Sequence, residues 1–300
     1  MIDRFSQKEK QIILSILFMI AASFSFACGS ILTKILGNSL LGDGVNPFQI
    51  AHARFFFSFI VLVLLSKFYK TEFKTNLIKI HVLRSCFGLL GISIWFTSIL
   101  YIPVSDATAI NFLNPIFAMI FAVYFLREQI DIIRWSAALV SLTGGLLLIR
   151  PSLDLTFNPI ALLCLFGAII MGLEIICIKF LTGKESIFKI LFLNNFIASF
   201  VASIFLPLTF KLPSIYELFG LIAIALFFLT GQFLFLNSMK RAEASLVMPF
   251  FYSTIIFVVF LDLIVFSFLP DLVSFIGASI IILGALIISF RELKIKIKCI

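Results

Sequence analysis

Two charged residues lie inside long apolar runs of this sequence. Arg54 lies near the start of the run QIAHARFFFSFIVLVLL (residues 49–65), and Glu174 lies in the run that covers residues 158–179. An arginine at the centre of a lone membrane span costs at least about 2.5–3.5 kcal/mol on insertion scales, so we expect something to compensate it. A guanidinium can bind a carboxylate or phosphate through two parallel hydrogen bonds, and a buried carboxylate can neutralise a cation or exchange a proton.

Each of these two residues also has a purely structural explanation. Glu174 could pair with Lys179 or Arg54 and only fix the packing of the helices. Arg54 could extend toward the lipid headgroups, because a long side chain reaches the interface from some depth. We expect both residues to line a cavity between helices. His52, two positions before Arg54, points elsewhere on a helix with a 3.6-residue period, and we expect it at the membrane interface.

Asparagines and a proline lie early in the run 106–126. Asn111 lies four residues before Pro115, and Asn114 lies directly before it. A proline frees a backbone carbonyl that can line a cavity or accept a substrate hydrogen bond. In the second half, Asn194 and Gln232 lie within apolar runs, where cavity lining and interhelical hydrogen bonding are equally good explanations.

Aromatic residues near the end of the run 82–101 could contribute a wall for a cation. Trp95, Phe96 and Tyr101 offer ring faces that attract a sulfonium or an amine. The chain has 39 phenylalanines, so many aromatic side chains must simply face lipid. By contrast, Ala137, Ser141 and Gly145 share one helix face and indicate close helix packing.

The composition identifies a membrane protein. The chain of 300 residues is 62% hydrophobic and 13% charged, with a mean hydropathy of +1.19, whereas soluble domains are about 45–50% apolar and about 25% charged. The net charge of +8 does not indicate nucleic-acid binding, because the basic residues punctuate apolar runs. The five cysteines lack CxxC spacing, and the sequence predicts no metal site and no cofactor. No GxSxG, GxGxxG or P-loop motif favours an enzyme.

The apolar runs predict an all-α integral membrane protein with ten transmembrane helices. The runs cover residues 12–33, 47–67, 82–101, 106–126, 132–149, 158–179, 188–209, 216–236, 245–268 and 271–290. The loop charges predict the orientation, because cytoplasmic loops carry an excess of Lys and Arg. Except for Lys34, Arg54, Arg150 and Lys211, all Lys and Arg fall on the first tail and every second loop, including Arg84. Both termini are therefore expected in the cytoplasm.

The two halves of the chain resemble each other. FACGSILTKIL (26–36) is similar to MGLEIICIKFL (171–181), and VSDATAINFLNPIFAMIFAVYFL (104–126) is similar to RAEASLVMPFFYSTIIFVVFLDL (241–263). Lys34 and Lys179 end the first helix of each half, and Ala107 and Thr108 align with Ala244 and Ser245. A unit of five spans enters the membrane from opposite sides in its two copies, so residues 1–150 and 151–300 are predicted to be inverted repeats.

Ten spans in two five-helix halves, a lysine that ends the first helix of each half, and NPIFAMIFAVYFLREQIDIIRW resemble the drug/metabolite transporter superfamily, EamA type. RFFFSFIVLVLL (54–65), HVLRS (81–85) and LEIICIKF (173–180) are most similar to bacterial S-adenosylmethionine uptake carriers. In the second half, the resemblance is weaker around Pro249, Tyr252 and Ser267.

The resemblance implies a secondary-active metabolite transporter of the bacterial inner membrane that works by alternating access. Its partners would be the lipid bilayer and a small-molecule substrate, with S-adenosylmethionine first and an amino acid or another amphipathic metabolite as the alternative. A membrane-embedded enzyme that modifies lipids is the less favoured reading, because no cluster of acidic residues and histidines is visible at one interface. A scaffold subunit would not need Arg54 and Glu174 within spans.

Overall fold

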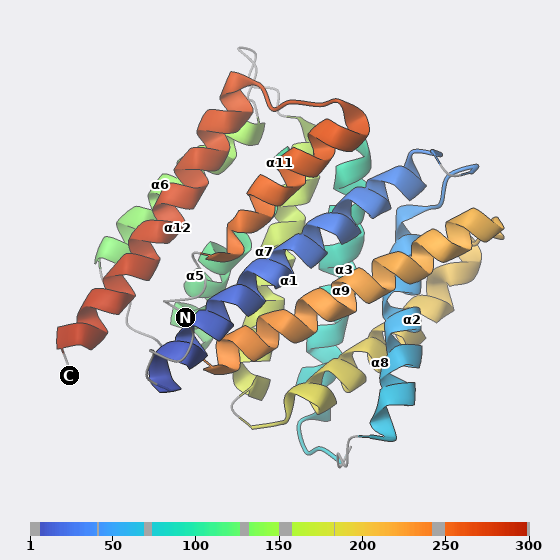
Figure 1. Ribbon diagram of the computed structural model, residues 1–300, viewed down its shortest axis with the longest axis horizontal. Helices are drawn as coiled ribbons and strands as arrows, with labels where there is room; N and C mark the ends of the chain where they lie inside the picture. Colours follow the sequence, from blue (N-terminus) through green and yellow to red (C-terminus); the bar gives the residue numbers. More distant parts are fainter. Residues whose placement is uncertain are drawn as a thin grey trace.

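The computed structural model describes residues 7–40, 42–68, 74–126, 132–149, 158–182, 184–241 and 250–298, and these residues form helices without any strand (Figure 1). The helices of the first half are α1 (Gln7–Gly37), α2 (Pro47–Ser66), α3 (Ile78–Tyr101), α4 (Val104–Asn111), α5 (Asn114–Leu126) and α6 (Ile132–Ile149). Those of the second half are α7 (Pro159–Thr182), α8 (Ile187–Phe205), the short 3-10 helix η2 (Leu206–Leu208), α9 (Ile215–Arg241), α11 (Ser253–Phe266) and α12 (Leu272–Lys298).

The predicted all-helical membrane fold is confirmed. Seven helical segments of the described chain are long and apolar enough to cross a membrane, and the two after residue 250 carry shorter apolar stretches. Nine of the ten predicted spans overlap these segments, whereas the span predicted at 132–149 corresponds to α6, which is not among them. The arrangement of ten transmembrane helices therefore stays a prediction. The helices α1 and α9 continue beyond the predicted ends into charged sequence. Ala244, Ser245 and Pro249, used in the repeat and in the resemblance, lie outside the described residues.

The span predicted at 106–126 is not one continuous helix. It divides into α4 and α5 at Phe112 and Leu113, which form a turn. Pro115 explains the break, because its nitrogen carries no hydrogen for the carbonyl of Asn111 and its ring would collide with that carbonyl in a regular helix. The prediction of a single helix was therefore wrong, although the expected release of a backbone carbonyl at the proline agrees with the break.

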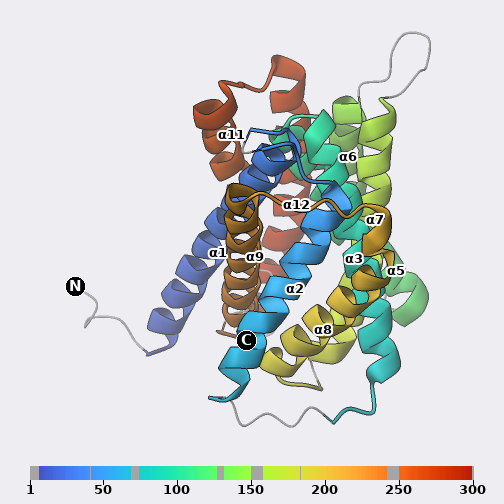
Figure 2. The ribbon, with the colours of Figure 1, turned by 90° about the vertical axis from the view of Figure 1, so that its right-hand side faces the viewer.

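The helices pack in pairs that join the two halves of the chain. The helix α1 crosses α9, α3 packs on α7, α2 packs on α8, and α6 packs on α12. Figure 1 shows α6 and α12 as a pair at one side of the bundle. In both Figure 1 and Figure 2, the first residues of α1 and the last residues of α12 lie toward the same end of the molecule.

Small residues allow α6 and α12 to approach closely, as expected for Ser141. Its hydroxyl donates a hydrogen bond to the carbonyl of Ile281, 3.2 Å away. A Cβ atom on Gly144 would lie 2.7 Å from the carbonyl oxygen of Gly277 and 2.9 Å from the backbone nitrogen of Ile281. A Cβ atom on Gly145 would instead meet a methyl group of Leu113, which belongs to a flexible side chain.

These neighbours predict different effects of two adjacent alanine substitutions. Gly144→Ala should destabilise the protein by about 1–3 kcal/mol, since a backbone obstacle cannot move aside. Gly145→Ala is the matched control and should cost less, because Leu113 can turn away. Thermal unfolding of both variants in detergent measures the difference, and equal melting temperatures would contradict the close contact between α6 and α12.

Candidate functional site

Glu174 forms its ion pair with Arg84, not with either of the partners expected from the sequence. The Arg84 Nε atom lies 3.8 Å from Oε1 of Glu174, so α3 and α7 are joined by charge. Arg84 is 1% exposed, and its Nη1 atom donates a hydrogen bond to the carbonyl of Ile190 on α8, 3.0 Å away. The assignment of Arg84 to a cytoplasmic loop was therefore wrong: it lies near the second turn of α3, at the junction of three helices.

A glycine makes room for the carboxylate of Glu174. Gly88 lies one turn after Arg84 on α3, so both residues occupy one face of that helix. A Cβ atom on Gly88 would lie only 2.9 Å from Oε1 of Glu174. Since any larger side chain at position 88 would displace the carboxylate, the ion pair depends on this glycine.

Arg54 is buried without a hydrogen bond. It is 6% exposed, and its Nε atom has no hydrogen-bond partner among the described residues. The guanidinium lies over the ring of Phe55 from its own helix and over the ring of Phe228 on α9, with Cζ 4.5 Å and 4.8 Å from the ring centroids. It also interacts electrostatically with Glu174 and Arg84. The cluster therefore contains two cations and one carboxylate.

Trp95, expected to contribute an aromatic wall, packs on Phe228, the ring that lies under Arg54. Its ring centroid is 6.3 Å from that of Phe228 in an edge-to-face arrangement, and Phe96 packs against both rings. The indole Nε1 of Trp95 is buried and has no partner within the described chain. Tyr101 does not join this wall, because it lies at the last turn of α3 and is 69% exposed.

The aromatic cluster continues across the interface between the halves. Phe228 packs on Phe26 of α1, whose ring lies 5.9 Å from that of Phe251. Phe251 in turn contacts Phe112, at the break between α4 and α5. Rings from α1, α3 and α9 and from the α4–α5 break therefore meet at one place, next to Arg54.

The other polar residues predicted to line the site have different surroundings. Asn194 is 1% exposed and accepts a hydrogen bond from the hydroxyl of Ser85, the residue that follows Arg84. Asn111 has a buried side-chain oxygen without a partner in the described part of the chain. The carbonyl of Asn114 lies at the tight contact of α5 with Gly172 on α7. No hydrogen bond or ion pair among the described residues links Asn111, Asn114 or the half-buried Gln232 to Arg54.

His52 faces a different neighbour from Arg54, as its helical phase predicts. Its Nε2 atom lies 2.9 Å from the hydroxyl of Ser203 on α8, and its ring stacks on Phe56. The side chain is buried, with 9% exposed, because the first half of α2 packs against α8 and α9 on most sides. This burial explains why an arginine two residues later is enclosed by protein.

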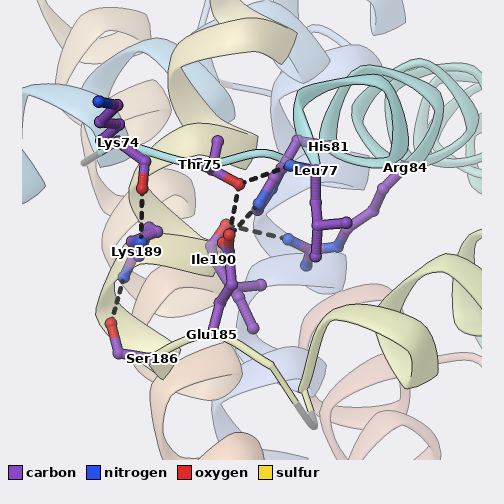
Figure 3. A network of polar contacts seen from close by, with 9 residues as sticks. All are labelled: Lys74, Thr75, Leu77, His81, Arg84, Glu185, Ser186, Lys189 and Ile190. Carbon is purple, nitrogen blue, oxygen red and sulfur yellow. Dashed lines mark hydrogen bonds and ion pairs between the residues drawn. The ribbon is translucent and has the colours of Figure 1, made fainter. Parts of the chain in front are cut away.

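A polar network that the sequence analysis missed joins α3 to the start of α8 (Figure 3). His81 Nε2 lies 2.7 Å from Oε2 of Glu185, and the hydroxyl of Thr75 donates to Oε1 of the same carboxylate. Lys189 adds a hydrogen bond from its Nζ to the carbonyl of Lys74, 3.0 Å away. His81, Arg84, Ser85 and Gly88 follow the i, i+3, i+4, i+7 pattern of one helix face, which was the available signal.

Glu185 lies between the spanning helices α7 and α8. Partial burial acts to raise the pKa of its carboxyl group, but the hydrogen bonds from Thr75 and His81 outweigh burial and lower that pKa below its ordinary value. The carboxylate is therefore ionised at neutral pH, with a favourable electrostatic environment.

The fold and the site define a multi-pass helical membrane protein with a buried cluster of charged and aromatic side chains. The model of the EamA-like transporter family matches residues 13–150 and again 158–290, and the chain belongs to that family. It is 30% identical to an S-adenosylmethionine uptake transporter of Rickettsia bellii, over 91% of this chain and 96% of the relative. A pseudopaline exporter of Pseudomonas aeruginosa is 23% identical, over 91% and 95% of the two chains.

A crystal structure of another protein has the same fold. It superposes with a TM-score of 0.66 at 16% identity, and the match covers 93% of this chain and 98% of the other. The family and the names of the relatives indicate a transporter rather than an enzyme, and the spans make it a multi-pass membrane protein.

The lowered pKa of Glu185 predicts a pH-dependent contribution to stability. A carboxyl group with a depressed folded-state pKa stabilises the protein above its ordinary pKa, and this stabilisation is lost as the pH falls through the lowered value. Glu185→Gln should therefore melt at a lower temperature than the parent at neutral pH, and the gap should close below about pH 4.5. Melting curves of both proteins against pH test this, and a constant gap at acidic pH would contradict it.

Proposed function

We propose that the chain is a secondary-active transporter that works by alternating access and carries S-adenosylmethionine. The name of the Rickettsia relatives supports this substrate, and the buried site supplies complementary chemistry. S-adenosylmethionine carries a carboxylate, a sulfonium and an aromatic base, and the site combines an arginine, a carboxylate and several rings. No ATP-binding motif is visible in the sequence, so ion gradients or exchange would drive transport.

The observation that carries the proposal is the charge balance around Arg54. Glu174 faces two arginines, and the nearer ion pair is with Arg84. The Nε atom of Arg54 is buried without a hydrogen-bond partner among the described residues, and such burial is costly, because ring faces and a distant charge replace water only in part. A substrate carboxylate would satisfy Arg54 through two parallel hydrogen bonds. The site is therefore suited to an anionic group.

The rest of the substrate fits the neighbouring side chains. The indole Nε1 of Trp95 is a donor without a partner in the described chain, so it suits an acceptor on the ligand. The ring faces around Phe228 suit a flat base or a sulfonium. Glu174 is the nearby negative charge that a sulfonium would approach, since its contact with Arg84 is longer than a hydrogen bond.

Two inverted five-helix repeats, residues 1–150 and 151–300, would provide the moving parts. The family model matches the chain twice, which supports the division. The pairing of helices supports it too: if α1 corresponds to α7 and α3 to α9, then the contacts α1–α9 and α3–α7 are equivalent. Sites at the interface of such repeats are exposed alternately to the two sides of the membrane.

A broader amphipathic substrate, such as an amino acid handled by an exporter, is the second candidate. The similarity to a pseudopaline exporter favours it, because that relative also matches over almost the whole chain. The same arginine and rings would bind such a molecule, so only a ligand comparison distinguishes the two candidates.

Arg54→Gln should weaken S-adenosylmethionine binding by roughly 10- to 100-fold, the loss expected for hydrogen bonds to a charged group. Thermal shift of the purified protein measures binding, since a ligand of the folded state raises its stability. His52→Gln is the matched control on the same buried turn of α2, and it should bind normally because His52 contacts Ser203 instead. Unchanged binding by Arg54→Gln would assign Arg54 to packing.

A ligand panel tests the substrate separately from the transport function. We expect stabilisation by S-adenosylmethionine and S-adenosylhomocysteine, which share the carboxylate, but not by decarboxylated S-adenosylmethionine. Stabilisation by an unrelated amino acid or nucleotide, with no response to either adenosyl carboxylate, would exclude the S-adenosylmethionine proposal and leave the transporter proposal intact.

We further propose the bacterial inner membrane as the location, with both termini in the cytoplasm. A single cysteine that replaces the exposed Phe68, at the end of α2, should react with a membrane-impermeant thiol reagent only after the cells are opened. Reaction in intact cells would reverse the orientation. A cysteine at Leu40, near the end of α1, is the control and should react from outside.

A further inference from the structure

A second buried ion pair lies between the last turns of α1 and α11. Asp262 on α11 is 0% exposed, and its Oδ1 atom lies 3.7 Å from Nζ of Lys34 on α1. The same Nζ atom lies 4.7 Å above the ring of Phe266. The pair therefore ties the first helix of the chain to a helix of the second half.

The carboxylate of Asp262 lacks the hydrogen bonds that usually compensate a buried charge. Neither oxygen accepts a hydrogen bond of ordinary geometry from the described residues, although the group faces the backbone N–H groups of Val104 and Ser105 at the start of α4. A buried carboxylate without such hydrogen bonds is costly in its charged form. Its proximity to Lys34 offsets only part of that cost, because 3.7 Å is longer than a hydrogen-bonded ion pair.

Two further acidic residues lie on α4 and at the start of α12 and share Ser274 as a hydrogen-bond donor. From α4, Asp106 is 7% exposed and accepts a hydrogen bond from the Ser274 hydroxyl, 3.0 Å away. At the start of α12, Oδ1 of Asp271 accepts a hydrogen bond from the Ser274 backbone, 2.9 Å away. Lys34 is the cation that α1 contributes, so negative groups outnumber it at this end of the described chain.

A polar face of α4 leads inward from Asp262. Ser105 and Thr108 lie three residues apart on this helix, and both hydroxyls are buried without partners among the described residues. Asn111, three residues further, has a side-chain oxygen in the same state. Residues spaced by three share one side of a helix, and these three span about 9 Å at 1.5 Å per residue.

We propose that Asp262 is a proton-binding site that controls the contact between α1 and α11. With a proton on one carboxylate oxygen, Asp262 is neutral and its burial costs little, so α1 and α11 stay in contact. When that proton leaves to water, Lys34 offsets only part of the charge that forms, and the end of the molecule at Lys34 opens so that water and the polar face of α4 reach the carboxylate. This opening rests on the proposed function only in being one step of the transport cycle, since proton binding itself needs no substrate.

Distances between spin labels on Leu40→Cys and Leu269→Cys, in purified protein without its native cysteines, test the proposal. Both positions are exposed, and they follow α1 and α11. The population with the longer distance should grow as the pH rises, by up to about tenfold per pH unit, the limit for one titrating group. Asp262→Asn should remove the pH dependence.

Lys34→Gln removes the cation of the ion pair but leaves the titrating carboxylate of Asp262 in place. Without its cation, the charged form of Asp262 is less favourable, so the transition should move to a higher pH rather than vanish. Glu217→Gln is the matched control: Glu217 is a carboxylate, 4% exposed, that accepts a hydrogen bond from the Ser214 backbone, 2.7 Å away, at the start of α9. Its substitution should leave the pH profile unchanged.

Three results would overturn the proposal: distances in the parent that do not depend on pH, an Asp262→Asn variant that still responds, or the same pH profile after Lys34→Gln. A merely structural ion pair would give a parent that does not respond and two variants that are open at every pH. Because no substrate is added, these outcomes are independent of whether S-adenosylmethionine binds, which the thermal-shift panel decides.

Discussion

The buried charge of Arg54 is the constraint on which the arrangement of the surrounding helices depends. A guanidinium among apolar helices must be enclosed by protein, because lipid cannot compensate it. The first half of α2 is accordingly buried, and α9 supplies Phe228 as a ring face beneath the arginine. Trp95 and Phe96 on α3 hold that ring in place through edge and tilted contacts. The contacts proposed to bind substrate are therefore also contacts that pack the helices.

Glycines determine which side chains pack at the two helix contacts beside Arg54, including the carboxylate of Glu174. When the two halves are aligned at Lys34 and Lys179, Gly29 corresponds to Glu174, since each lies five residues before its lysine. Glu174 packs over Gly88, whereas a Cβ atom on Gly29 would lie 2.6 Å from the Phe228 ring. At the contact of α3 with α7, a carboxylate therefore packs over a glycine. At the contact of α1 with α9, a glycine packs under a phenylalanine ring. If the two halves are repeats, as proposed, their equivalent crossings carry different side chains, and the cluster around Arg54 is asymmetric.

The sequence predicted most of the helical spans and the enclosure of Arg54 between helices, because apolar runs of fixed length and intramembrane charges are properties of local sequence. It did not predict the role of Arg84. That residue follows Lys79 near a helix end and looks like a loop charge, and only its contacts with Glu174 and Ile190 show otherwise. Tyr101 was misjudged for a related reason: its place at the last turn of α3 and the neighbours that would cover it follow from tertiary packing.

The two ends of the molecule are closed by contacts of different chemistry. Near the chain termini, Glu185 accepts hydrogen bonds from Thr75 and His81, and its lowered pKa keeps it charged. At the other end, Asp262 has Lys34 nearby but no ordinary hydrogen bond within the described chain. Both contacts link the first half to the second, so alternating access would require each to break in turn. Because burial disfavours the charged form of Asp262, a rising pH that removes its proton should open the Asp262 end, whereas Glu185 stays charged and hydrogen-bonded.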